Sequence, residues 1–149
     1  MGKSVKLVQI DGKLPNLALM RLSSYYKEKG YQVDFTRSVN KDLFDKEYDY
    51  VFGSSIFQFS INRINRLKKN YPDAIIGGTG TDNWKLVIED YIGDYDKLDY
   101  SLYPDVDFSI GFSQRGCRLK CKFCVVPTKE GKNVSNDSIH KIWRGNPYP

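Results

Sequence analysis

Histidine and cysteine are scarce in this chain of 149 residues, which contains one histidine and three cysteines. The single histidine, His140, has no catalytic motif around it, so the sequence offers neither a Ser–His–Asp arrangement nor the paired carboxylates of a hydrolase. Long apolar runs are lacking as well, and no stretch approaches the length of a membrane-spanning helix. The opening residues 1–6 lack the apolar region of a secretory signal. These absences predict a cytoplasmic protein without a membrane partner.

Charge is unevenly distributed along the chain. Residues 1–100 carry 15 basic and 14 acidic side chains (+1), and residues 101–149 carry 8 basic and 4 acidic ones (+4), which together give the formal net charge of +5. The basic excess gathers at four positions near the cysteines: Arg115, Arg118, Lys120 and Lys122. Such a cluster suits an anionic metal centre or a solvated loop, and contact with nucleic-acid phosphates is the less favoured interpretation.

The first hundred residues alternate between apolar runs and helical patterns. The runs predict buried strands at 5–10, 31–36, 49–54 and 74–77. Helices are predicted from Leu14-Pro15-Asn16 to Gly30 with Pro15 in the first turn, along a basic amphipathic stretch ending near Asn70, within 39–47, and over 84–92. This order predicts a doubly wound α/β domain with a mainly parallel sheet, Rossmann-like or flavodoxin-like, over residues 1–93. A linker rich in tyrosine and aspartate is predicted over residues 94–104.

The remaining residues carry a different pattern. Apolar and polar side chains alternate over residues 106–113, which predicts a further strand that leads to the cysteines. A polar loop is expected over residues 128–133, and a helix from Ser135 or Asn136 through Trp143.

The cysteines all lie within eight residues, Cys117-Arg118-Leu119-Lys120-Cys121-Lys122-Phe123-Cys124, with the spacing C-x3-C-x2-C. Soft thiolates this close together suit an iron–sulfur cluster, zinc or cuprous copper. A cubane cluster normally takes four cysteine ligands, so three would leave one iron with an open coordination position. An odd number of cysteines without a secretory signal disfavours a disulfide framework.

This loop resembles the C-x3-C-x-aromatic-C loop of the radical S-adenosylmethionine (SAM) superfamily. The resemblance implies that Cys117, Cys121 and Cys124 hold a four-iron four-sulfur cluster whose fourth iron chelates SAM, with Phe123 near the adenine side of SAM. It implies an enzyme that reductively cleaves SAM to methionine and a 5′-deoxyadenosyl radical, which abstracts hydrogen from an unidentified substrate. A one-electron donor such as flavodoxin or ferredoxin is then an expected partner.

In that family, the strand before the cluster loop is the first strand of an incomplete (β/α)6 barrel, so residues 105–149 are expected to be the N-terminal part of a radical SAM domain. Such a domain takes about two hundred residues, and only 25 follow Cys124. The chain is therefore expected to be truncated and not to complete catalysis alone. The unpaired strand edge at 105–113 is expected to favour a homodimer.

The first domain resembles, in layout, the Rossmann-like cobalamin-binding domain that precedes many radical SAM barrels. The family motif D-x-H-x-x-G is matched here by Asp11-Gly12-Lys13-Leu14-Pro15-Asn16, in which the histidine and the final glycine are absent. Gly77, Gly78, Thr79 and Gly80 resemble the loop that wraps the nucleotide tail, because glycine lets backbone N–H groups approach a phosphate. A tight strand-to-helix turn is the alternative explanation of these glycines. The domain is expected to be degenerate, and cobalamin is not an expected cofactor.

A second hypothesis comes from a different functional class. The chain could be a non-enzymatic α/β binding or regulatory module with a structural zinc held by the three cysteines and His140. The spacing before His140 is long for a compact zinc finger. If it is not a ligand, His140 is expected to be a solvent-facing helix residue.

Overall fold

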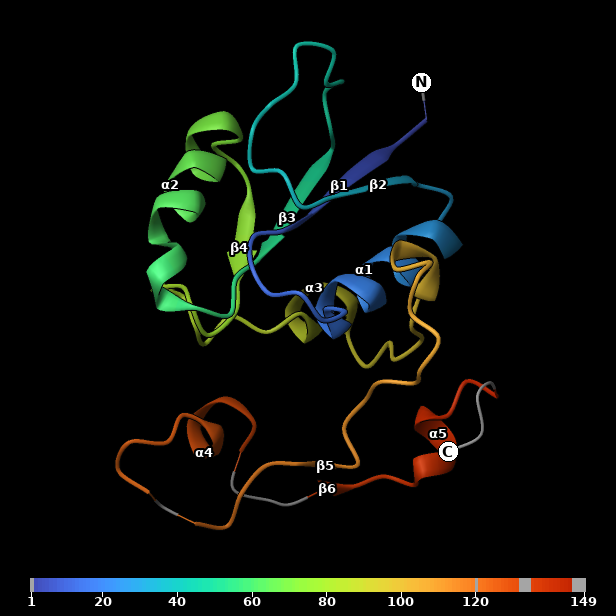
Figure 1. Cartoon of the computed structure of the whole chain (residues 1–149), viewed down its shortest axis with the longest axis vertical. Coiled ribbons are helices and arrows are strands. Elements are labelled where there is room, and N and C mark those ends of the chain that lie inside the picture. Colours follow the sequence, from blue (N-terminus) through green and yellow to red (C-terminus); the bar gives the residue numbers. More distant parts are fainter. Residues whose placement is uncertain (1, 120, 132–134, 146–149) are drawn as a thin grey trace. The chain divides into compact units, whose positions relative to one another are not determined.

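The computed structural model describes residues 2–119, 121–131 and 135–145, and it divides into two compact units. The first unit covers Met1–Tyr103 and the second covers Pro104–Pro149. Along the chain (Figure 1) the elements are β1 (Ser4–Gln9), α1 (Leu17–Glu28), β2 (Gln32–Thr36), β3 (Tyr50–Ser54), the 3-10 turn η1 (Gln58–Ser60), α2 (Ile61–Asn70), β4 (Ile75–Gly77), α3 (Glu89–Ile92), the 3-10 turn η2 (Tyr100–Leu102), β5 (Gln114–Arg115), α4 (Val126–Lys129), β6 (Ser135–Asn136) and α5 (Ile139–Ile142).

A parallel four-stranded sheet in the order β2-β1-β3-β4 forms the centre of the first unit. All six residues of β1 are buried, as expected for a parallel strand that is covered on both faces. Figure 1 shows α1 and α2 on opposite sides of this sheet. The predicted α/β domain and its four parallel strands are confirmed.

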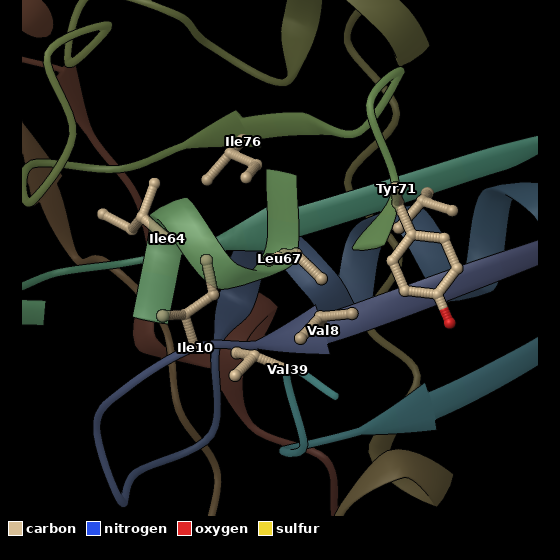
Figure 2. Packing of buried hydrophobic residues seen from close by; sticks show 8 residues of the cluster. Val8, Ile10, Val39, Ile64, Leu67, Tyr71 and Ile76 are labelled. Carbon is tan, nitrogen blue, oxygen red and sulfur yellow. The ribbon is translucent and has the colours of Figure 1, made fainter. Parts of the chain in front are cut away.

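Two apolar clusters, one on each face of the sheet, hold the helices in place. On one face, Val5 and Leu7 of β1 pack with Leu19 and Leu22 of α1. On the other, the strands, α2 and the residues that follow them contribute a second cluster (Figure 2): Val8, Ile10, Val39, Val51, Ile64, Leu67, Tyr71 and Ile76. Because successive side chains of a strand point to opposite faces, one apolar run in β1 serves both clusters.

Helix α1 begins and ends on local signals. The Asn16 side chain caps its start by accepting a hydrogen bond from the backbone N–H of Leu19 at 3.1 Å. Gly30 follows the helix with a φ of +80°, a conformation that glycine adopts without a Cβ clash. The predicted helix is confirmed, but Pro15 precedes the cap instead of lying in the first turn.

Two other helix predictions are corrected by the structure. Residues 39–47 contain a turn and no helix, and helical structure within 84–92 is confined to α3. In the first case, tertiary contacts hold the loop, because the Asp45 carboxylate accepts hydrogen bonds from Lys6 Nζ and Tyr71 Oη, both at 2.5 Å. Lys6 is a buried cation of β1, so this pairing compensates for its removal from water. None of the helices among the described residues is long and apolar enough to cross a membrane.

The segment predicted as a linker, residues 94–104, belongs to the first unit as far as Tyr103. The Asp99 carboxylate accepts hydrogen bonds at 2.6 Å from both Ser23 Oγ and Lys27 Nζ of α1. Tyr103 is buried, and its hydroxyl donates to Gln9 Oε1 at 2.8 Å. The segment therefore closes the α1 side of the domain.

We expect Asp99 to make the first unit sensitive to acid. Burial acts to raise the pKa of its carboxyl, but hydrogen bonds from Lys27, Ser101 and Ser23 outweigh burial and lower the pKa to about 2. This folded-state pKa lies below the value of about 3.9 in the unfolded chain, so the ionised carboxylate stabilises the fold. Its contribution to the free energy of unfolding is present above about pH 4 and is lost as the pH falls towards 2. Urea unfolding at several pH values should show an acid loss of about 1 kcal/mol that Asp99→Asn lacks. Parallel pH curves for the two proteins would contradict this assignment.

The second unit contains little regular structure among its described residues. Strands β5 and β6 form an antiparallel ribbon of two residues each, and α4 and α5 have four residues each. Helix α5 is shorter than predicted, because β6 occupies Ser135–Asn136 and Ser138 provides the cap. Three residues of the predicted basic cluster and polar loop lie outside the described residues: Lys120, Lys132 and Asn133.

The strand predicted over residues 106–113 is not formed in the structure. Apolar and polar side chains do alternate in this segment, but a strand forms only where a neighbouring strand completes its backbone hydrogen bonds. This segment instead contacts the end of α5, where Arg144 Nη1 donates to the Val106 carbonyl oxygen at 2.9 Å and Arg144 N donates to Ser109 Oγ at 2.9 Å. Phe108 and Phe112 are left exposed.

Candidate functional site

The cysteine loop lies between β5 and α4 and is held at its base by two hydrogen bonds. The backbone N–H of Gly116 donates to the Glu130 carboxylate at 3.0 Å, and the N–H of Cys117 donates to the Gly131 carbonyl at 3.3 Å. At the far end, Cys124 N donates to Cys121 O at 3.1 Å and closes a turn. The loop thus presents its cysteines from a short, fixed stem.

The three thiols are free, with Cys117 and Cys124 half-buried and Cys121 exposed. Within the described part of the chain, no three His, Cys, Asp or Glu side chains are grouped closely enough to hold a metal ion. The chemistry of the donor set nevertheless fits an iron–sulfur cluster or zinc, because three unpaired thiols lie on one loop. Metal binding would have to draw them together, as is usual where ligand binding and folding are coupled.

Two other residues singled out in the sequence lie apart from any such grouping. The Phe123 ring is 91% exposed next to Cys124. His140 is exposed on α5, where its backbone N–H donates to the capping Ser138 Oγ at 3.2 Å. The solvent-facing position expected for a non-ligand His140 is therefore the one observed.

The glycine-rich segment after β4 packs against the loop that follows β3. Gly80 N donates to Ser55 O at 3.1 Å, and Thr79 Oγ1 donates to Ile56 O at 2.9 Å. A Cβ on Gly78 would lie 2.0 Å from Ser55 O, and one on Gly80 would lie 2.6 Å from Phe57 N. The backbone of residues 55–57 therefore occupies the space beside these glycines. The Gly80 N–H already donates to Ser55 O, so it is not free to bind a phosphate.

Asp11 ties the same edge of the sheet together from the end of β1. Its carboxylate accepts hydrogen bonds from Ser55 Oγ at 2.6 Å, Ile56 N at 2.7 Å and Phe57 N at 3.2 Å. Burial acts to raise the pKa of this carboxyl, but these bonds and one from Ser60 lower it below its ordinary value. The aspartate that matches the first position of the cobalamin-type motif thus accepts hydrogen bonds from the chain's own backbone amides.

A buried polar network beside Asp11 was not anticipated from the sequence. The Tyr103 hydroxyl donates to Gln9 Oε1 at 2.8 Å and accepts from Asn16 N at 3.1 Å. The Asn16 side-chain amide donates to Ser54 Oγ at 2.8 Å. Gln9 and Tyr103 are 94 positions apart, so no local pattern could have revealed their pairing. The sequence offered one signal for this network, the position of Gln9 at the end of a parallel strand, because polar ligand sites of open α/β sheets gather at such ends.

Comparisons with protein-family models, with curated proteins and with solved structures find no match to this chain.

Proposed function

We propose that the loop Cys117–Cys124 holds a four-iron four-sulfur cluster and that the chain is part of a radical SAM protein. The observation that carries the proposal is the set of three free thiols at C-x3-C-x2-C spacing on one short-stemmed loop. When bound, such a cluster supplies one electron for the cleavage of SAM to methionine and a 5′-deoxyadenosyl radical. The partners that follow are SAM, a substrate of unknown structure and a one-electron donor such as flavodoxin or ferredoxin.

The residues of the loop have distinct tasks in this proposal. Cys117, Cys121 and Cys124 bind as thiolates, and the nearby cations Arg118 and Lys122 offset the negative charge of a thiolate-ligated centre. The exposed ring of Phe123 offers an apolar surface against which an adenine could pack. The hydrogen bonds of Gly116 and Cys117 fix the stem, so only the loop itself needs to rearrange on binding.

The second unit would then be the first part of a (β/α)6 barrel. In such a barrel, residues 106–113 would pair with further strands and form the ladder of a strand, which they do not form among the described residues. A homodimer formed through residues 105–113 would supply partners in another way. Either arrangement would cover Phe108 and Phe112, which are 41% and 50% exposed.

A structural zinc site in a non-enzymatic module is the second candidate. It is favoured by the position of His140 on the same compact unit as the three cysteines. Zinc takes four tetrahedral ligands in structural sites, so this candidate requires His140 to move to the cysteines. It predicts a colourless protein without redox chemistry.

Anaerobic reconstitution of the full chain with ferrous iron and sulfide tests the two candidates directly. The cluster hypothesis predicts a brown protein with about four irons and four sulfides per chain, and bleaching on reduction. Iron and sulfide assays with visible absorption measure this, and zinc is measured on the same sample. A colourless product that retains about one zinc per chain would favour the regulatory module instead.

A further inference from the structure

A pocket of about 300 Å³ lies in the first unit, between the loop after β2 and the first two turns of α2. It is separate in sequence from both the cysteine loop and the glycine-rich segment. The loop and the helix line it with seven residues: Arg37, Ser38, Val39, Asn40, Asn62, Arg63 and Arg66. Six of the seven side chains are polar and three are arginines, so the lining is cationic.

No carboxylate balances these three arginines. The pocket lining contains no aspartate or glutamate, and none of the ion pairs found among the described residues involves Arg37, Arg63 or Arg66. Three arginines around one pocket repel one another, and an anion among them would relieve this repulsion. The composition of the pocket therefore indicates an anionic ligand.

Two of the arginines are held in place by backbone carbonyls. Arg63 donates from Nε to Ile10 O at 2.7 Å and from Nη2 to Arg37 O at 2.9 Å. Arg37 donates from Nη2 to Lys13 O at 3.2 Å, and its guanidinium lies 5.9 Å from the centre of the Tyr103 ring. These contacts order the arginines before any ligand arrives, which reduces the entropic cost of binding.

The loop is fixed to the helix as well, because Asn70 Nδ2 donates to the Val39 carbonyl at 2.8 Å. Arg66 is exposed, and its guanidinium has no hydrogen-bond partner among the described residues. Its five donors are therefore available to a ligand. The pocket also lies beside the N-terminal half of α2, a ten-residue helix without an acidic residue in its first turn, where the helix dipole favours an anion.

We propose that this pocket binds the phosphate group of a small phosphorylated molecule. Guanidinium groups match phosphate oxygens with paired donors, and the amides and hydroxyl of Asn40, Asn62 and Ser38 can complete the shell. A volume of about 300 Å³ suffices for a phosphate and an attached sugar and is at the lower end for ligand pockets. The arginines line one pocket, whereas a nucleic-acid backbone is followed by an extended basic stripe. This site does not depend on the cysteine loop.

Calorimetric titration of the full chain with ribose 5-phosphate, inorganic phosphate and unphosphorylated ribose tests the proposal. Ribose 5-phosphate and inorganic phosphate should bind at one site and compete, and ribose should not bind. Arg66→Gln should weaken binding of ribose 5-phosphate about tenfold, because it removes a charge-assisted donor set. Lys68→Gln removes the same charge from the same helix outside the pocket and should change the affinity by less than about twofold.

Circular dichroism checks that the variants remain folded, and Asn62→Asp offers a second test, because a carboxylate in the lining should abolish binding. Absence of phosphate binding at about 10 mM would overturn the proposal. Equal losses for Arg66→Gln and Lys68→Gln would overturn it too, since diffuse attraction would then suffice. A short single-stranded RNA that binds with a steep salt dependence, while ribose 5-phosphate does not, would identify a nucleic-acid surface instead.

Discussion

Replacing Cys121 with alanine is expected to reduce the iron bound after anaerobic reconstitution from about four atoms per chain to almost none. A cluster held by three thiolates has no spare protein ligand, and the sequence contains no fourth cysteine to take over. Cys121 is also the most suitable position to test, because its side chain is exposed and the variant loses no packing in the metal-free fold. Alanine at Cys117 or Cys124 should have the same effect on the iron content.

Two controls separate loss of a ligand from general damage to the loop. Phe123→Ala removes an exposed ring next to Cys124 and should leave the iron content unchanged, although it should weaken SAM binding. His140→Ala should also leave the iron content unchanged, whereas a zinc site that uses His140 would lose most of its metal. A Cys121→Ala protein that keeps a full complement of iron and sulfide would rule out the three-cysteine cluster.

Alanine at Gly78 is expected to destabilise the first unit by about 3 kcal/mol or more. The residue has a φ of +109°, and its Cβ would lie 2.0 Å from the Ser55 carbonyl oxygen. That oxygen cannot simply move away, because it accepts the hydrogen bond from Gly80 N and lies beside the bond from Ser55 N to Gly77 O. Relief of the clash therefore requires both loops to separate.

The neighbouring glycine provides a matched control for this prediction. A Cβ on Gly77 would lie 3.5 Å from the Leu86 side chain, an ordinary van der Waals contact, and its φ is not in the left-handed region. Gly77→Ala should change the free energy of unfolding by no more than about 1 kcal/mol. Urea unfolding followed by circular dichroism measures both variants. If they are equally stable, the loops do not pack as described, and the glycines need another explanation.

The Gly78 experiment also bears on the resemblance to a nucleotide-tail loop. If these glycines serve the packing of two loops, Gly78→Ala loses stability whether or not a ligand is present. If they serve a ligand, the variant should keep its stability and lose only binding. The observed backbone contacts of Ser55, Ile56 and Phe57 favour the first outcome.

The framework of the first unit could be predicted from local sequence patterns. A parallel strand that is buried on both faces reads in the sequence as a short apolar run. The run at residues 5–10 predicted such a strand, and β1 is buried throughout. Gly30 marked the end of α1, because a left-handed turn is a property of a single residue, whereas the predicted start with Pro15 in the first turn was too early. The cysteine spacing was likewise a local pattern, to which the structure adds that the three thiols are free.

Features that depend on distant partners could not be predicted from local patterns and became visible in the folded chain. Residues 106–113 alternate between apolar and polar side chains like a strand, but they pair with no other strand among the described residues. Residues 39–47 form no helix, because hydrogen bonds from Lys6 and Tyr71 to the Asp45 carboxylate hold them as a loop. The arginine pocket joins residues 37–40 to residues 62–66. Periodicity and capping act over a few neighbouring residues, whereas hydrogen bonds, ion pairs and backbone approaches between loops depend on positions that the folded sheet brings together.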